Sequence, residues 1–374
     1  MFQTQTRSVT STEIAGIGVT LDRTPLDWLD HYDEKIGNKI VLAYVVDDPE
    51  PQNPLETMDG EGRIYVASHG REAQAEIREA LAINEFGDPD FELLQDFPEE
   101  FKDRWVQRAV KDTEFQEWCF KQPMLEQEPG ETDEAFYRSV ANTYWDEWGG
   151  CTSPNSEVFD WDFTAAVERA LFEELRDTGK IGDPDAVLLD IYEHSGVRYS
   201  VSGTGMQDPW DTTRGGAVWI PDDCAREEIS RRAEVYQFGS IEGVVRDGKK
   251  QWTMVFDEDE SEDIRFESWH ECFETAQAWV AERTDGNKAL GRRRAAADIA
   301  EGACELYTDF CNGSVFGVVV EVHEFENGDD EATCVEMDEV YGHYGFTHAE
   351  EVVKESFEAM VAKLKSEAEQ SIVH

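Results

Sequence analysis

The sequence predicts an α+β protein with small mixed or antiparallel sheets and a mostly helical acidic insertion. Residues 186–192, 197–201 and 216–220 are short apolar or alternating runs separated by glycine-containing turns, a pattern typical of strands. Residues 91–185 repeat apolar side chains at helical spacing. The apolar periodicity of residues 286–374 predicts two helices with a hairpin between them. These three observations together favour an α+β fold.

The remaining elements follow from the same periodicities. Strands are expected at 39–46 and 64–67, a hairpin at 235–245 and 251–256, and a second hairpin at 315–322 and 333–340, with a link at 341–345. Helices are expected at 71–83, 99–110, 113–120, 133–148, 163–176, 268–283, 296–310 and 348–369, another following Pro221, with Thr347 as the N-cap of the last. We therefore divide the chain into an N-terminal α+β segment (1–90), a helical acidic insertion (91–185), a central α+β core (186–285) and a C-terminal helix-hairpin-helix unit (286–374).

The net charge of −50 is the dominant physical property of the chain. A chain of this mass is expected to expose roughly 15,000 Å², or about one net charge per 300 Å². Duplex DNA carries about one charge per 100 Å² of its cylinder. An even distribution would thus be about threefold too dilute to imitate DNA, and only a concentrated arrangement could do so.

The charge is unevenly distributed along the sequence. Residues 186–256 hold 11 acids and 8 bases, whereas residues 257–374 hold 30 acids and 9 bases. Residues 1–90 and 91–185 have net charges of −11 and −15. We expect a nearly neutral central hub with acids on peripheral helices and hairpin tips. The alternative, adaptation to high salt, predicts acids on all faces, and the scarcity of lysine (12, against 21 arginines) is consistent with it.

Two acidic runs are the predicted partner-binding surface. They comprise Asp257, Glu258, Asp259, Glu260, Glu262 and Asp263 in the first run, and Glu324, Glu326, Asp329, Asp330 and Glu331 in the second. A basic partner would be attracted to such runs. The cluster of Lys288, Arg292, Arg293 and Arg294 is expected to form ion pairs within the chain or between subunits.

An enzymatic alternative centres on the loops at 190–214. His194, Asp208, Asp211 and Arg214 fall on connections between expected strands, where catalytic groups are often placed. They would have to converge in one concave pocket to support a metal-dependent or hydrolytic reaction. The competing interpretation is that these residues only stabilise turns, because Asp and Ser side chains hydrogen-bond to the nearby backbone of a turn.

We expect no metal and no cofactor. The pairs His343/His348 and Cys304/Cys311 do not match the spacing of structural zinc sites, and the acids at 47–61 match no calcium loop. Seven scattered cysteines argue against a full disulfide framework. The sequence contains no membrane-spanning run and no apolar signal core near its start, which predicts a location in the cytoplasm.

Three blocks carry a resemblance: NPLETMDGEGRIY (53–65), IYEHSGVRYS with PWDTTRGGAVWIP (191–221), and NGSVFGVVVEV with YGHYG (312–345). In this order they resemble a family of uncharacterised proteins carried by phages and plasmids. The insertion at 91–185 departs from that family. The resemblance implies a mobile-element context, in which small acidic proteins often block host nucleases and defence systems. The leading hypothesis is therefore a non-enzymatic nucleic-acid mimic that binds a basic, nucleic-acid-binding host protein, without binding nucleic acid or membranes itself.

Overall fold

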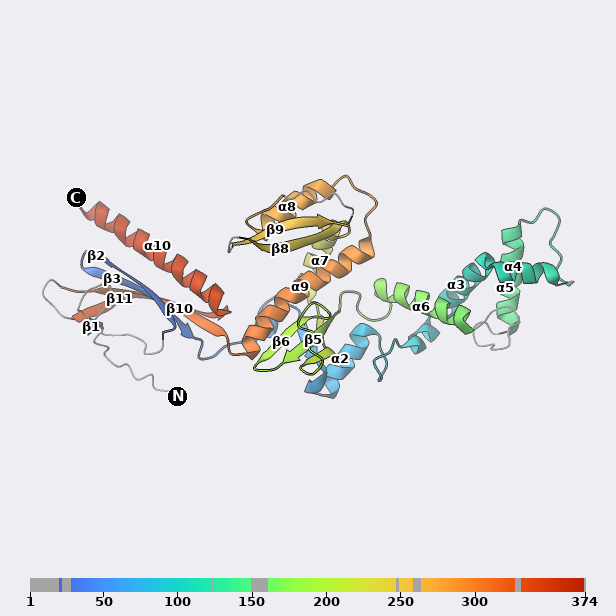
Figure 1. Ribbon diagram of the computed structural model, residues 1–374, viewed down its shortest axis with the longest axis horizontal. Helices are drawn as coiled ribbons and strands as arrows, with labels where there is room; N and C mark the ends of the chain where they lie inside the picture. Colours follow the sequence, from blue (N-terminus) through green and yellow to red (C-terminus); the bar gives the residue numbers. More distant parts are fainter. Residues whose placement is uncertain are drawn as a thin grey trace.

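The computed structural model describes residues 20–21, 28–122, 124–148, 161–246, 249–257, 264–326 and 331–372. Figure 1 shows a long molecule in which a C-terminal sheet, a central unit and a helical unit follow one another along the longest axis. The small, mainly antiparallel sheets and numerous helices confirm the predicted α+β class. Within the described residues, none of the helices combines the length and apolar character that crossing a bilayer requires.

The central unit is built on a four-stranded antiparallel sheet. Its strands β4 (Arg63–Val66), β7 (Thr212–Ile220), β5 (Val187–Glu193) and β6 (Val197–Val201) lie in that order. The three strands expected between 186 and 220 are confirmed, and β7 begins four residues earlier than expected. The neutral segment therefore does form the buried centre of the molecule, with Leu189, Ala217 and Trp219 fully buried.

Helices cover both faces of this sheet. On one face lie α7 (Asp223–Tyr236), α9 (Lys288–Cys311) and the short α1 (Pro54–Thr57), and on the other α2 (Arg71–Leu81), which follows the 3-10 turn η2 (Ala67–His69). Helices α7 and α9 approach closely at Gly291, where a Cβ would lie 2.5 Å from the Gln237 nitrogen. Helix α9 starts eight residues before the expected 296, so the basic cluster lies in its first turns.

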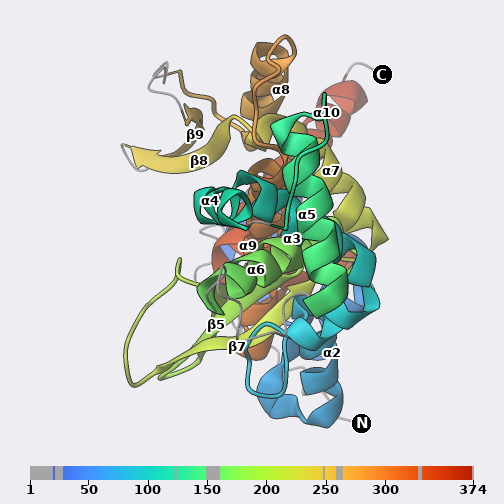
Figure 2. The ribbon, with the colours of Figure 1, turned by 90° about the vertical axis from the view of Figure 1, so that its right-hand side faces the viewer.

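A smaller layer stands beside α7. The hairpin β8 (Gly239–Arg246) and β9 (Lys249–Phe256) pairs as expected, but β8 begins four residues later than expected because Val235 and Tyr236 end α7. It packs with α8 (Trp269–Val280), whose N-cap is Ser268. Figure 2 shows this hairpin extending to one side of the molecule. Its core is continuous with that of the central sheet, so residues 186–311 form one hydrophobic unit.

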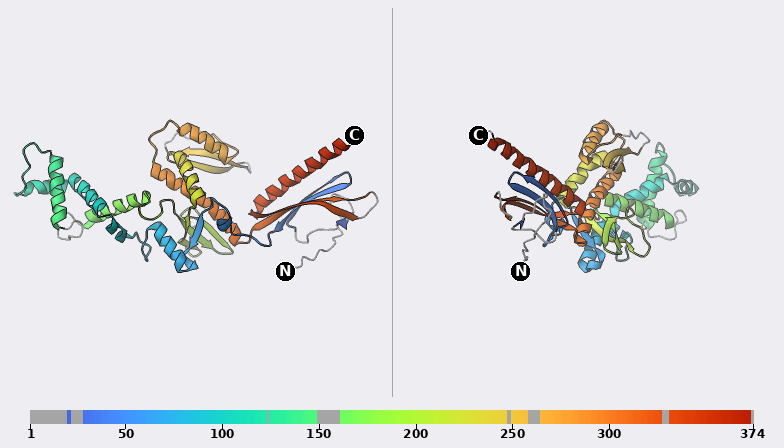
Figure 3. Two further views of the ribbon diagram at one scale, coloured as in Figure 1. Left: turned by 180° about the vertical axis from the view of Figure 1, so that it is seen from behind. Right: turned by 60° about the vertical axis from the view of Figure 1, so that its left-hand side comes forward.

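The C-terminal sheet combines the two ends of the chain. Strands β1 (Thr20–Leu21), β11 (Glu331–Tyr344), β10 (Val315–Glu324), β3 (Lys39–Asp47) and β2 (Asp30–Ile36) lie in this order. Helix α10 (Phe346–Ile372) packs across one face, as both views of Figure 3 show. Strand β11 includes residues 341–344 of the expected link and ends before Gly345, and Thr347 lies inside α10 rather than capping it.

The helical unit has a core of its own. It contains the 3-10 helix η3 (Phe91–Asp96), α3 (Pro98–Lys111), α4 (Thr113–Lys121), α5 (Asp133–Trp148) and α6 (Trp161–Asp177). Each α-helix corresponds closely to an expected one. Trp105, Phe115 and Phe136 are buried in this core, so most of the aromatic residues in this segment pack internally rather than offering a docking surface.

The arrangement in space differs from the division by sequence. The described residues among 1–90 do not form a separate segment, because β2 and β3 join the C-terminal sheet while β4 and α2 join the central one. Helix α9, assigned to the C-terminal unit, packs on α7 and β6. The physical reason is strand pairing: β3 completes its hydrogen bonds only with β10, and no local pattern in the sequence reveals so distant a partner.

Candidate functional site

The loop between β6 and β7 is held in place by the buried carboxylate of Asp190. This side chain accepts hydrogen bonds from the Ser202 hydroxyl, the Gly203 nitrogen, the Gln207 amide and the Gly215 nitrogen, at 2.8–2.9 Å. Burial acts to raise the pKa of Asp190, but the hydrogen bonds outweigh it and lower the pKa to about 2. One ionised side chain on a strand thereby fixes a loop of about ten residues.

The structure brings two of the four enzymatic candidates together. The Nδ1 atom of His194 lies 3.0 Å from Oδ2 of Asp211, and the His194 side chain is largely exposed. Asp208 instead caps the turn, accepting from the backbone nitrogens of Trp210 and Asp211. Arg214 is exposed on β7, and within the described part of the chain it makes no ion pair. Of the four candidates, the structure therefore joins only His194 and Asp211, and the hydrogen bonds of the turn account for Asp208.

The same loop presents two large apolar side chains to solvent. Trp210 is 91% exposed and Met206 57% exposed, although the backbone around them is fixed by Asp190 and Asp208. The loop projects from the sheet in Figure 2. An exposed tryptophan on a fixed loop is typical of a protein contact, because a rigid aromatic side chain loses little entropy on binding.

The first two sequence blocks behind the resemblance lie in the central unit, and the third contacts this unit at Asn312 before it continues into the C-terminal sheet. Asp222, at the N-cap of α7, accepts from the nitrogens of Gly60 and Gly62, and Asn312 bonds to both the nitrogen and the carbonyl of Val197. Gly62 has φ +64°, and a Cβ there would lie 2.6 Å from the Ile220 carbonyl oxygen. The motifs thus specify how this unit is assembled. A comparison with protein families, curated proteins and solved structures gives no match to the chain.

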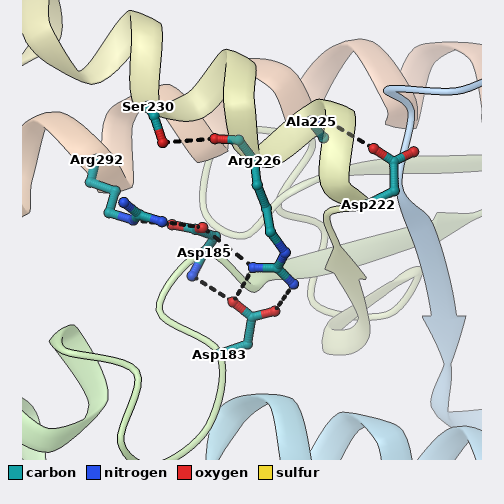
Figure 4. A network of polar contacts seen from close by, with 7 residues as sticks. All are labelled: Asp183, Asp185, Asp222, Ala225, Arg226, Ser230 and Arg292. Carbon is teal, nitrogen blue, oxygen red and sulfur yellow. Dashed lines mark hydrogen bonds and ion pairs between the residues drawn. The ribbon is translucent and has the colours of Figure 1, made fainter.

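A buried ion-pair network joins the central sheet to its covering helices. Asp185 is fully buried and bonds to Arg292 (Nη2 to Oδ2, 2.7 Å), while Arg226 forms a two-pronged bond to Asp183 at 2.6 and 3.0 Å. Figure 4 shows both arginines reaching the same loop from different helices. Burial acts to raise the pKa of Asp183, but the Arg226 hydrogen bond and the other favourable contacts lower it overall. These arginines are therefore structural.

The basic cluster serves this same purpose. Arg292 binds Asp185, Arg293 lies 3.8 Å from Asp177, and Arg294 binds Asp257 through both of its terminal nitrogens. The three arginines therefore have the expected role in internal ion pairs, whereas Lys288 is exposed and makes no ion pair within the described residues. The Arg294 pair also changes the interpretation of Asp257, whose pKa is lowered by the Arg294 hydrogen bonds. Asp257 is fixed to α9 and is not a free contact for a partner. The other members of that run, Glu258, Asp259, Glu260, Glu262 and Asp263, lie outside the described residues.

The second acidic run contains both a hydrogen-bonded carboxylate and exposed ones. Glu324 is half-buried and accepts from the Asn38 amide, whereas Glu326 and Glu331 are exposed. Asp329 and Asp330 lie outside the described residues. Strand β11 extends the exposed negative charge with Asp338 and Glu339. The exposed carboxylates of Glu326, Glu331, Asp338 and Glu339 are called the β11 acidic edge below.

The helical unit carries a second acidic surface. Its exposed acids include Glu92, Asp96, Glu99, Glu100, Asp103, Glu114, Glu117, Glu126, Glu128, Asp133, Glu134, Asp146, Glu147, Glu173, Glu174 and Asp177. Only some are paired with a base, as in Lys102–Asp146, Arg104–Glu174 and Arg138–Glu134. The surplus of carboxylates on this surface is therefore not neutralised by the unit's own cations.

The shape of the molecule reduces the average density of charge. The accessible surface is 23276 Å², well above the roughly 15,000 Å² expected for a compact chain of this mass, because the units are strung out rather than packed together. One net charge therefore covers about 470 Å², against about 100 Å² for DNA. Any imitation of nucleic acid must be confined to local surfaces such as the β11 acidic edge.

Proposed function

We propose that the protein is a non-enzymatic inhibitor from a mobile element, which acts in the host cytoplasm by occupying the nucleic-acid-binding groove of a basic host protein. The observation that carries the proposal is the division of charge. Arginines of the central unit are used in internal ion pairs, while exposed acids accumulate at both ends of the molecule. Opposite charge would speed docking and make binding weaken with salt.

The β11 acidic edge is the surface we assign to the partner. Its four carboxylates lie on and beside one hairpin, and the strand places Glu331 and Asp338 about 23 Å apart, at about 3.3 Å per residue. Successive side chains of a strand point to opposite faces, so Asp338 and Glu339 extend the charge to both faces. Carboxylates held on a regular strand support docking on a basic groove better than a diffuse negative charge.

The proposal is tested by capture followed by competition. The immobilised protein is incubated with lysate of its host at low salt, and bound proteins are challenged with duplex DNA, with RNA or with high salt. We expect a nucleic-acid-binding protein to be retained and then released by nucleic acid as well as by salt. Release by salt alone would indicate non-specific ion exchange, and retention of no nucleic-acid-binding protein would refute the proposal.

The β11 acidic edge is tested with a matched pair of variants. One carries Glu326→Gln, Glu331→Gln, Asp338→Asn and Glu339→Gln, and the control carries Glu326→Asp, Glu331→Asp, Asp338→Glu and Glu339→Asp. The first loses four charges, whereas the control keeps them with altered side-chain length. Weaker capture by the first variant alone would support the assignment. Equal capture by both would show that the partner, if any, binds elsewhere.

The other predicted run needs a different variant. Glu258, Asp259, Glu260 and Glu262 can be changed to Gln or Asn while Asp257 is kept, because Arg294 depends on Asp257. We expect an unchanged or higher melting temperature, since like charges repel each other, together with weaker capture. Unfolding of this variant would show that these carboxylates are structural and would remove the run from the proposed surface.

The two alternatives make distinct predictions. A metal-dependent or hydrolytic enzyme needs His194, Asp208, Asp211 and Arg214 in one site, and the described geometry supports only the exposed His194–Asp211 pair. A protein adapted to high salt should fold poorly below molar salt. Cooperative melting in dilute buffer would remove that alternative, whereas a requirement for molar salt would favour it over mimicry.

A further inference from the structure

A cluster of ionisable side chains lies on the face of the C-terminal sheet that α10 does not cover. Glu321 and His323 occupy alternate positions of β10, and both side chains are fully buried. Their neighbours on this face are Leu42 and Ile40 of β3, opposite them in register, whereas Val320 and Val322 point to α10. Two ionisable groups thus stand on one face of a strand whose other residues before Glu324 are apolar or glycine.

A β-bulge adds a cysteine to the pair. Val322 lies opposite Glu336, but the next residue, His323, lies opposite Cys334, so that Val335 is left out of the pairing. Directly opposed residues of antiparallel strands point to the same face. The bulge therefore turns Cys334 toward His323, and re-aiming a side chain in this way is a recurrent use of bulges at functional sites.

The three side chains are close enough to share one ion. Nε2 of His323 lies 2.9 Å from Oε2 of Glu321, and one ligand atom from each of Glu321, His323 and Cys334 falls within 4.8 Å of the others. Ligand atoms around a tetrahedral zinc ion stand about 3.3–3.8 Å apart, given bonds of about 2.0–2.3 Å. An increase of a few tenths of an ångström in the distance between Nε2 of His323 and Oε2 of Glu321 would admit the ion.

We propose that Glu321, His323 and Cys334 form a binding site for a divalent transition metal, with zinc as the best match. Carboxylate, imidazole and thiolate together are a donor set that zinc accepts, while calcium and magnesium require oxygen ligands. Binding forms bonds from the metal to Oε2, Nε2 and Sγ. The proton held between Nε2 and Oε2 is displaced, so that the neutral imidazole carries its proton on Nδ1, and the Cys334 thiol proton passes to solvent. Three protein ligands leave a fourth position for water or another donor.

A neighbouring hydroxyl orients the carboxylate. The Tyr44 hydroxyl lies 3.0 Å from Oε1 of Glu321, which leaves Oε2 for the ion. Such outer contacts fix the geometry of metal ligands. Because β3, β10 and β11 all contribute, the ion would fasten the centre of the sheet to the strand that carries the β11 acidic edge. The site is independent of the proposed function.

The test measures metal binding by the full-length chain. The protein is treated with a chelator, exchanged into metal-free buffer and titrated with Zn²⁺ against a chromophoric chelator, and Co²⁺ is added separately to detect thiolate-to-cobalt absorption. We expect one metal per chain, a cobalt–thiolate band and a higher melting temperature with zinc. Cys334→Ser should abolish the band and weaken zinc binding at least tenfold.

Matched variants separate this site from adventitious binding. Cys311→Ser and Cys224→Ser change exposed cysteines elsewhere and should leave the stoichiometry and the band unchanged. His323→Gln should also weaken binding, and its circular dichroism shows whether the chain still folds. Cys334→Ser is nearly isosteric at a half-buried position, so it remains informative if His323→Gln does not fold. Absence of a cobalt–thiolate band, or zinc binding that Cys334→Ser leaves unchanged, would overturn the proposal.

Discussion

The central unit and the helical unit treat their carboxylates in opposite ways. In the central unit, Arg226, Arg292 and Arg294 each bind a specific aspartate, so acids become part of the scaffold. In the helical unit the core is aromatic, and many acids on its surface have no cation beside them. The difference shows that acidic side chains stabilise the central unit when each is paired with an arginine, and weaken the helical unit by mutual repulsion when they are not.

The largest expected effect comes from breaking the central network. Arg292→Met keeps most of the apolar stem but leaves the fully buried Asp185 with only the longer contact to Arg226, at 3.4 Å. An incompletely compensated buried charge costs about 3–5 kcal/mol. We expect the free energy of unfolding of the central unit to fall by roughly 3 kcal/mol, measured by denaturant titration.

The adjacent arginine provides the control. Arg293→Met removes an exposed cation that lies 3.8 Å from Asp177, and exposed pairs contribute about 0–1 kcal/mol. It should change stability little. Equal losses from both variants would contradict the view that burial, rather than charge alone, makes the network important.

Acid should affect the two regions in opposite directions. The folded pKa of Asp190 is about 2, below its usual 3.8, so its contribution is present above about pH 4 and is lost as the pH falls toward 2. A shift of this size corresponds to roughly 2.5 kcal/mol. Burial raises the pKa of Glu168 in α6 above 4.5, so lowering the pH relieves a cost there.

Hydrogen exchange followed by mass spectrometry resolves the two regions in one experiment. From neutral pH to about pH 4.5, peptides of the helical unit should gain protection after correction for intrinsic exchange rates. Below about pH 4, peptides around 187–220 should lose it. Parallel loss of protection in both regions over the whole range would contradict the comparison.

The loop held by Asp190 gives a smaller, local effect. Asp190→Asn replaces one acceptor oxygen by an amide that faces donors, and an unsatisfied buried group costs about 1–3 kcal/mol. We expect a loss of roughly 2 kcal/mol, increased exchange at 202–211 and a weaker acid dependence. Asp211→Asn, which alters only the exposed His194 pair, should stay within about 0.5 kcal/mol. A loop that remains protected in Asp190→Asn would show that Asp190 does not hold it.

Local periodicity predicted most elements, and chemistry within them was harder to recognise. The observed bounds of strands β5 and β6 and of helices α3 to α5 agree closely with those expected from the spacing of apolar residues. The reason is that burial of one face determines both the spacing and the type of element. The β3–β10 pairing was missed, since it joins residues as far apart as Leu42 and Glu321. Long-range pairing depends on the whole chain and leaves no local signal.

The site residues show the same limit. His194 and Asp211 were found because they lie on turns, where polar residues attract attention. Asp190 and the Glu321–His323 pair were missed because they stand within strands. The signal was nevertheless in the sequence: an ionisable residue inside an apolar strand is costly to bury and needs compensating contacts. Such residues were better indicators of built sites here than the dense acidic runs.

The smallest expected effect lies on the helical surface. Asp103, Glu147 and Glu173 are exposed, and the described structure gives none of them an ion pair. The variant Asp103→Asn, Glu147→Gln and Glu173→Gln removes three repelling charges while the buried core around Trp105 is kept. We expect a gain of up to about 1 kcal/mol at low salt, because single surface changes stay within about 0.5 kcal/mol. Salt should diminish the gain by screening the same repulsion in the parent protein.

Thermal melting at low and high salt measures both the gain and its dependence on salt. The control is Glu134→Gln, which breaks the Arg138 pair and is expected to give no gain. A loss of stability in the triple variant at low salt would show that these carboxylates support the helices, and the contrast between the two units would then not extend to this surface.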